Sequence, residues 1–202
     1  MTLPNVEPIT CGVHQCSNAA ILHITQFHEG SFTGIQHLCC AHGARYTTLA
    51  ELAHRAQLTH RAQQAHESSR GQPVPMVLEC IAFHDQSPLT VIVLRETDGR
   101  RLFLLPGDYY TSAAVSQSVQ TLERPGTHHA MAMLLEACEA SLQQIVVENR
   151  DSAGAFHTIL TIRIYGITKR IDIRPSDALA LSHVCKVPFM VNSSLLCEES
   201  SP

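Results

Sequence analysis

Residues 155–185, AFHTILTIRIYGITKRIDIRPSDALALSHVC, contain the clearest structural pattern in this chain of 202 residues. In the first part, apolar side chains recur with a period of two, which places Phe156, Leu160, Ile162 and Ile164 on one face of a strand. KRIDIR (169–174) predicts a second strand. PSDALALSHVC (175–185) predicts a helix, because proline suits a helix start, where its missing N–H is not needed. The stretch therefore predicts two strands that lead into a helix.

Upstream, from residue 76, short segments rich in β-forming residues come in groups, and helical segments separate these groups. Strands are predicted at MVLECIAF (76–83), LTVIVLR (89–95), RLFLL (101–105) and QQIVVENRD (143–151), and a last one downstream at VPFMV (187–191). Helices are predicted at TSAAVSQSVQTL (111–122) and in RPGTHHAMAMLLEACEA (124–140), the second with Met131 and Met133 packed in the core. This order predicts an α+β fold with a mixed or antiparallel sheet and interposed helices, rather than a strictly alternating α/β fold.

The opening of the chain has a different signature, CGVHQCSNAAILHITQFHEGSFTGIQHLCCAH at 11–42. Cys11 and Cys16 form one short-spaced pair, and Cys39 and His42 form another, on either side of a predicted hairpin. A structural zinc site takes four thiolate or imidazole ligands from two such pairs. We choose Cys39 over Cys40 because two intervening residues suit a knuckle turn, whereas Cys40 would leave only one. The competing histidines, interpreted as strand or surface residues, are His14, His23, His28 and His37.

The cellular setting supports metal binding over disulfide formation. Residues 1–10 have no basic start and no apolar run, so we expect no signal peptide. No apolar stretch reaches the roughly 18 residues of a membrane span, so we expect no membrane contact. In the cytoplasm that we therefore expect, clustered cysteines stay reduced. The net charge of −4 argues against a strongly basic surface, so RNA or DNA would have to contact local patches.

These patterns divide the chain into three parts: a zinc-binding module at 1–43, a helix and linker at 44–75, and an α+β domain at 76–202. Residues 44–67 are rich in helix-forming residues, and SSRGQPVP (68–75) has the composition of a linker. The module is too small to bury a sizeable core, so we expect zinc to supply most of its folding free energy.

Two segments, RPGTHHA (124–130) and RPSDALA (174–180), each place arginine, proline and a small residue before a helix. A structural interpretation is that Thr127 and Ser176 cap the two helices. In this interpretation Arg174 pairs with a nearby acid, Asp177 or Asp172.

A functional interpretation assigns the same segments to an anion site. A guanidinium group beside a helix N-terminus binds phosphate well, because the fork and the free N–H groups both donate to it. Arg124 and Arg174 would then meet at one phosphate, with His128 or His129 as proton donor.

Two parts of the chain resemble known families. CGVHQCSNAAILHIT…HLCCAH resembles small zinc modules of bacterial proteins, with a first spacing of four residues instead of two. Residues 76–199 resemble the bifunctional nuclease domain family through RPGTHH and RPSDALAL. This resemblance implies an α+β domain and, from plant members, hydrolysis of RNA and DNA. It carries over the motif positions Arg124, Thr127, His128, Arg174, Ser176 and Asp177. The family tends to have a glutamate near residue 110, where LLPGDYYTSAAV offers only Asp108.

Two functions follow. A nuclease would use either a divalent cation such as magnesium, held by Asp177 and then Asp108 or Asp172, or His128 as acid–base with the two arginines as anion clamp. The alternative is a non-catalytic adaptor. Its zinc module would dock a protein partner, and its second domain would bind a phosphorylated ligand or form a homo-oligomer.

Overall fold

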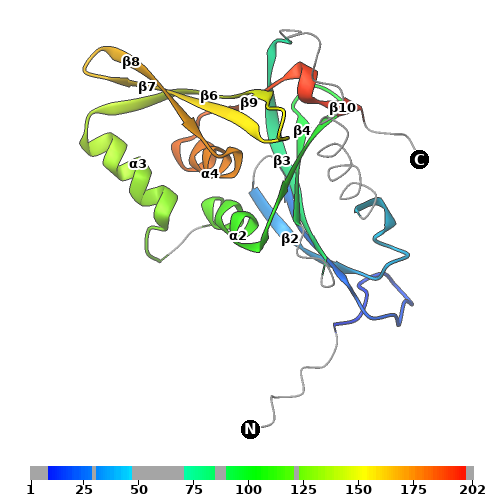
Figure 1. The fold of residues 1–202 in the computed structure, drawn as a ribbon. Helices are drawn as coiled ribbons and strands as arrows, with labels where there is room; N and C mark the ends of the chain where they lie inside the picture. The colour runs from blue at the N-terminus through cyan, green and yellow to red at the C-terminus, as the bar shows by residue number, and fades with distance from the viewer. Residues whose placement is uncertain (1–8, 29–30, 47–70, 85–89, 121–122, 199–202) are drawn as a thin grey trace.

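The computed structural model describes residues 9–28, 31–46, 71–84, 90–120 and 123–198, whose fold is shown in Figure 1. The strands are β1 (Leu22–His28), β2 (Ser31–Leu38), β3 (Pro73–His84), β4 (Thr90–Glu96), β5 (Arg101–Gly107), β6 (Ala140–Arg150), β7 (Phe156–Ile164), β8 (Ile167–Ile173), β9 (Phe189–Asn192) and β10 (Cys197–Glu198). The helices are α2 (Tyr109–Ser118), α3 (Thr127–Ala137), α4 (Pro175–Cys185) and a 3-10 turn, Ser193–Leu195. The predicted α+β fold is confirmed. Most of the helix predicted at 44–67 lies outside the described residues.

The strands join in one sheet with the order β10-β5-β4-β3-β9-β6-β7-β8, and β1 and β2 attach beside β3. All of these pairs are antiparallel except β6 with β9. The predicted mixed or antiparallel sheet is therefore confirmed. None of the described helices is both long and apolar enough to cross a membrane.

Helix α4 occupies the centre of the larger core, on one face of the sheet. Its residues Ala178, Leu179, Ala180 and Leu181 are all at most 1% exposed, so the helix is buried on several sides. It packs with α2 and with apolar side chains of the strands, including Ile92, Phe103 and Ile145. The alanines allow close approach of neighbouring elements. This packing fixes the first turn of α4, where the RPSD motif lies.

The β1–β2 hairpin of the predicted zinc module extends the sheet beside β3 and contributes apolar side chains to the core on its other face. Strand β1 pairs with the second half of β3, from Leu22 opposite His84 to Gln26 opposite Cys80. Apolar residues of the hairpin share a second core with alternate residues of β4 and β5, so these two strands are buried on both faces. The division of the chain near residue 76 stays a prediction, but the hairpin and the larger domain share one sheet.

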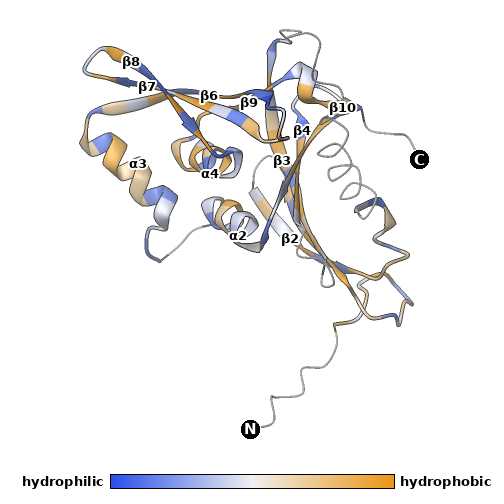
Figure 2. Cartoon of the chain, in the orientation of Figure 1, coloured by the Kyte–Doolittle hydropathy of each residue, from blue (hydrophilic) through white to orange (hydrophobic). Residues whose placement is uncertain are grey.

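Helix α3 differs from its prediction. It begins and ends within the predicted segment, but none of its residues is buried. Met131 is 37% exposed and Met133 is 58% exposed, so the prediction that these methionines pack in the core is wrong. The helix contacts α4 and β6, and no element among the described residues covers its opposite side (Figure 2).

A buried histidine gives the fold a pH dependence. Burial lowers the pKa of His183, on α4, from 6.5 to about 4, and its Nδ1 lies 3.2 Å from the Ser118 hydroxyl of α2. Because the unfolded chain takes up this proton at higher pH than the folded chain, stability should fall as the pH drops from 6.5 towards 4.

We expect the replacement His183→Leu to reduce this acid destabilisation. Between about pH 7 and pH 5, the wild-type protein should lose on the order of 1–2 kcal/mol more unfolding free energy than the variant. Urea unfolding at both pH values measures the difference. Parallel losses in the two proteins would contradict the assignment.

Candidate functional site

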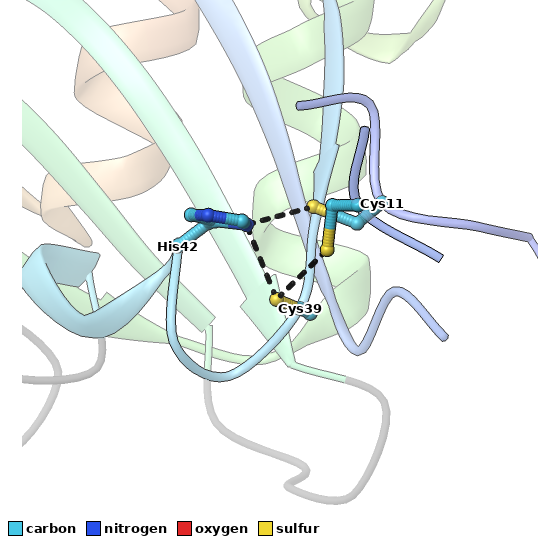
Figure 3. A group of neighbouring side chains, drawn as sticks. Cys11, Cys39 and His42 are labelled. Carbon is cyan, nitrogen blue, oxygen red and sulfur yellow. Dashed lines mark hydrogen bonds between the residues drawn. The ribbon is translucent and has the colours of Figure 1, made fainter. Parts of the chain in front are cut away.

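Four side chains predicted as zinc ligands converge beside the β1–β2 hairpin. The candidate ligand atoms of Cys11, Cys16, Cys39 and His42, here called the Cys–His cluster, all lie within 4.8 Å of one another. His42 Nδ1 is 3.3 Å from Cys11 Sγ and 3.4 Å from Cys39 Sγ, contacts drawn in Figure 3. Among the described residues this is the one group of three or more metal-binding side chains so arranged. Three sulfurs and one imidazole fit the donor set of a structural zinc ion.

The local backbone explains how a four-residue spacing still forms a knuckle. The amide of Cys16 donates to the carbonyl of Val13 at 3.0 Å, which closes a turn. Gln15 has a φ of 63°, in the left-handed region, and this reverses the chain so that Cys16 faces Cys11. The second knuckle is closed by the amide of Gly43, which donates to the Cys39 carbonyl at 2.8 Å.

Electrostatics favour the thiolate, the form in which cysteine binds metal, at Cys39 and Cys11, whereas burial and the neighbouring cysteines raise the pKa of Cys16. A backbone hydrogen bond from His42 lowers the pKa of Cys39 to about 6. Burial raises the pKa of Cys11, but hydrogen bonds from the backbone of Val13 and Cys39 outweigh that effect and lower it overall. Asn18, which the sequence reasoning missed, places its side-chain nitrogen 3.9 Å from Cys39 Sγ. No spacing rule distinguishes Asn18 from other polar residues of the loop.

The competing residues are placed differently. Cys40 is exposed, whereas Cys39 is only 3% exposed. His23 and His37 face each other across the hairpin, with their Nδ1 atoms 2.7 Å apart, and neither belongs to the Cys–His cluster. The ligand set predicted from spacing is thus the set that the fold assembles.

A second group of side chains links the two Arg-Pro turns. His128 Nε2, in the first turn of α3, lies 3.2 Å from Asp177 Oδ1, in the first turn of α4. Arg174 Nε donates to the other carboxylate oxygen, Asp177 Oδ2, at 2.7 Å. We call His128, Asp177 and Arg174 the Asp177 cluster. Its carboxylate also lies where the helix dipole of α4 favours negative charge.

The members of this cluster differ in their access to solvent. The side chains of His128 and Asp177 are 11% and 22% exposed, whereas that of Arg174 is 80% exposed. The Nε of Arg174 donates to Asp177, so its two terminal nitrogens can donate to another acceptor or to water. The cluster therefore combines an oriented imidazole with an accessible cationic fork.

The other predicted site residues are arranged around the cluster. Arg124 is exposed ahead of α3 and, within the described residues, makes no hydrogen bond or ion pair with Asp177 or Arg174. Its convergence with Arg174 stays a prediction. Thr127 is exposed, and Ser176 is 8% exposed.

The predicted capping roles are wrong. The N-cap of α3 is Gly126 and that of α4 is Arg174, and neither makes a side-chain cap hydrogen bond. Each helix starts one or two residues earlier than a cap at Thr127 or Ser176 would require. The predicted pairing of Arg174 with Asp177 is present.

Asp108 acts as a helix cap. Its carboxylate accepts a hydrogen bond from the Thr111 amide at 2.8 Å, at the start of α2. This backbone hydrogen bond lowers the pKa of Asp108, and the positive charge of Arg174 adds a smaller lowering. Asp108 is thus within electrostatic range of the cluster, but its oxygen is engaged by the backbone.

A groove of about 480 Å³ adjoins the cluster at Arg174. Its wall includes Phe156, His157 and Asp172. The His157 ring lies between two carboxylates, 3.6 Å from Asp151 and 3.7 Å from Asp172. The groove therefore offers aromatic surface and acidic groups beside the exposed guanidinium.

Comparison with known proteins assigns the larger part of the chain to one family. The family model described as the bifunctional nuclease domain matches residues 92–202, which is more than half of the chain and includes both Arg-Pro turns. The matched region begins within β4, so the hairpin with the Cys–His cluster precedes it. No curated protein matches the chain.

Proposed function

Since the chain belongs to the bifunctional nuclease domain family, we propose that it hydrolyses phosphodiester bonds of RNA or DNA at the Asp177 cluster. The observation that supports this proposal is the contact of His128 with Asp177, because it joins the starts of α3 and α4 in one site. Phosphodiester hydrolysis needs a group that moves a proton and a cation that stabilises charge on the phosphoryl oxygens.

His128 is suited to the proton transfer. With a proton on Nε2, the imidazole donates to Asp177, which leaves Nδ1 free of a proton and able to act as a base toward water. Asp177 holds the ring in this tautomer and stabilises the positive charge that develops on it. Arg174 in turn fixes the carboxylate at 2.7 Å.

Arg174 is suited to binding the phosphate. Its terminal nitrogens can donate two parallel hydrogen bonds to phosphoryl oxygens, a geometry that lysine lacks. The groove beside it is lined by Asp172, and Asp151 lies 3.6 Å from His157 of the same wall; these carboxylates would repel a second phosphate. We therefore propose that the groove takes the base or sugar next to the scissile bond.

Metals enter the proposal in two ways. Zinc, held by the Cys–His cluster, would have a structural role, and its module offers a surface for a protein partner. Magnesium, if used, would share Asp177 with His128 and Arg174, and would supply charge stabilisation at the phosphate. Assays with metal-free buffer and with added magnesium show whether hydrolysis requires magnesium or proceeds with His128 and Arg174 alone.

The test is hydrolysis of single-stranded RNA and DNA by metal-defined protein. We expect His128→Ala to lower the rate by about 10²–10⁴-fold, the usual contribution of a general acid–base residue. The matched control is His129→Ala, which removes the adjacent imidazole and should retain activity. Binding of nucleic acid without cleavage by the wild-type protein would support the adaptor alternative instead. Equal losses in both variants would contradict the role of His128.

A further inference from the structure

The uncovered side of α3 has the pattern of a buried helix face. Ala130, Met133, Leu134 and Ala137 follow the spacing i, i+3, i+4, i+7, so they form a single stripe along the helix. All four are exposed, with Leu134 at 65%. No charged residue lies within this stripe. An apolar face of this kind is normally covered, and in the described part of this chain nothing covers it.

The stripe is symmetric about its midpoint, which points to the identity of the partner. Read in either direction, it has alanine at each end and two large apolar residues in the middle. In an antiparallel pair of α3 helices related by a two-fold axis, Ala130 lies over Ala137 of the second copy, and Met133 lies beside Leu134 of the second copy. Such self-complementarity is the requirement for an isologous interface. The small terminal residues allow the helices to approach closely.

Charge at the two ends of α3 favours the same arrangement. The end of the helix carries Glu136 and Glu139, whereas in the segment that enters the helix the charges of Glu123 and Arg124 offset each other. An antiparallel pair keeps the two acidic ends apart and places each beside an end without net charge. The helix dipoles are then also opposed, which is favourable. A parallel pair would place like charges together.

Further apolar side chains are exposed at the end of the β7–β8 hairpin. Ile164 of β7 pairs with Ala140 of β6 on one side and with Ile167 of β8 on the other. Ile167 therefore lies two strands away from Ala140, the residue at which β6 begins after α3. Ile167 is 61% exposed, and Tyr165, in the turn, is 74% exposed. With the stripe, they expose on the order of several hundred Å² of apolar area, close to the roughly 800 Å² per partner of a standard interface.

We propose that a second copy of this chain covers the stripe, and that the protein is a two-fold dimer through antiparallel α3 helices. This proposal does not depend on nuclease activity. It has a consequence for the Asp177 cluster, because His128 lies in the first turn of α3. The pairing brings Glu139 of the second copy to the end of the helix that carries His128.

The first test is the mass in solution. Analytical ultracentrifugation of the full chain at micromolar concentration should give twice the 22.2 kDa of the monomer. Leu134→Glu should weaken dimerisation by at least about 100-fold, because two charges without partners would be buried at the axis. The matched control is Ile35→Glu, at a residue of β2 that is 56% exposed, which should leave the dimer intact. A monomeric wild type, or a dimer unaffected by Leu134→Glu, would overturn the proposal.

The second test measures the direction of pairing and does not rely on a disruptive variant. In a chain whose exposed Cys40, Cys138 and Cys197 are changed to serine, Ala130→Cys and Ala137→Cys are prepared separately and mixed. The antiparallel pair predicts disulfide-linked dimers mainly in the mixture, because a disulfide requires Cα atoms within roughly 7 Å. Rapid linking of Ala130→Cys with itself would indicate a parallel pair, and no linking would indicate a different interface. Either result would exclude the proposed dimer.

Discussion

Cys39→Ser should release zinc from the protein and unfold the hairpin that carries the Cys–His cluster. Cys39 is 3% exposed, lies 3.9 Å from Cys16 Sγ and 3.4 Å from His42 Nδ1, and so contacts both knuckles. Three ligands hold zinc far more weakly than four. Structural zinc sites contribute about 10–16 kcal/mol of apparent binding free energy in small modules, so this loss is large compared with the stability of a domain.

We expect the effect to extend beyond the module. Cys11, Leu22 and Cys39 share the second core with residues of β3, β4 and β5, and β1 pairs directly with β3. Loss of the hairpin would therefore unpair the second half of β3 and expose part of the second core. Elemental analysis should show loss of about one zinc per chain, and thermal unfolding should show a melting temperature lowered by about 10 °C or more.

The neighbouring cysteine provides the matched control. Cys40→Ser makes the same chemical change one residue away, at an exposed side chain outside the cluster. It should retain zinc and the wild-type melting temperature. Retention of zinc by Cys39→Ser, or its loss from Cys40→Ser, would show that the ligand set is different.

The features that the sequence predicted well are those set by local pattern. Helix α4 runs from Pro175 to Cys185, as predicted, because proline marks its start and the apolar residues that follow are all needed in the core. The zinc ligands come in two pairs of short spacing, so each pair is held by a single turn. In both cases residues close in the chain determine the structure.

The features that local pattern does not determine depend on distant contacts. His128 and Asp177 are 49 residues apart, and their contact exists only because α3 packs on α4. The pairing of β1 with β3 likewise joins segments separated by more than 40 residues. The error for α3 has a different origin, because Met133 lies on an apolar stripe that a monomer leaves exposed. Periodicity predicts that such a stripe is covered, but not by which chain.

Under the proposed function, Asp177→Asn should abolish most phosphodiester hydrolysis while the fold stays intact. The amide keeps the size of the side chain but loses the charge, so it no longer stabilises a protonated His128 or holds Arg174 by an ion pair. We expect kcat to fall by about 10²–10⁴-fold, which is the range for a disabled general base. The pair of Asp177 with Arg174 is exposed on the arginine side, so its loss should change stability by no more than about 1 kcal/mol.

The division between kcat and KM distinguishes the members of the cluster. Arg174→Lys keeps a positive charge but loses the fork, so it should chiefly raise KM, whereas Asp177→Asn should chiefly lower kcat. The double variant should lose less than the product of the single losses, because both residues position the same groups. Asp98→Asn, in the β4–β5 turn and remote from the cluster, is the matched control for a change of acid to amide and should keep both constants. If Asp177→Asn retained wild-type kcat on RNA and DNA, the cluster would be only a structural link between α3 and α4, and the site of hydrolysis would have to lie elsewhere.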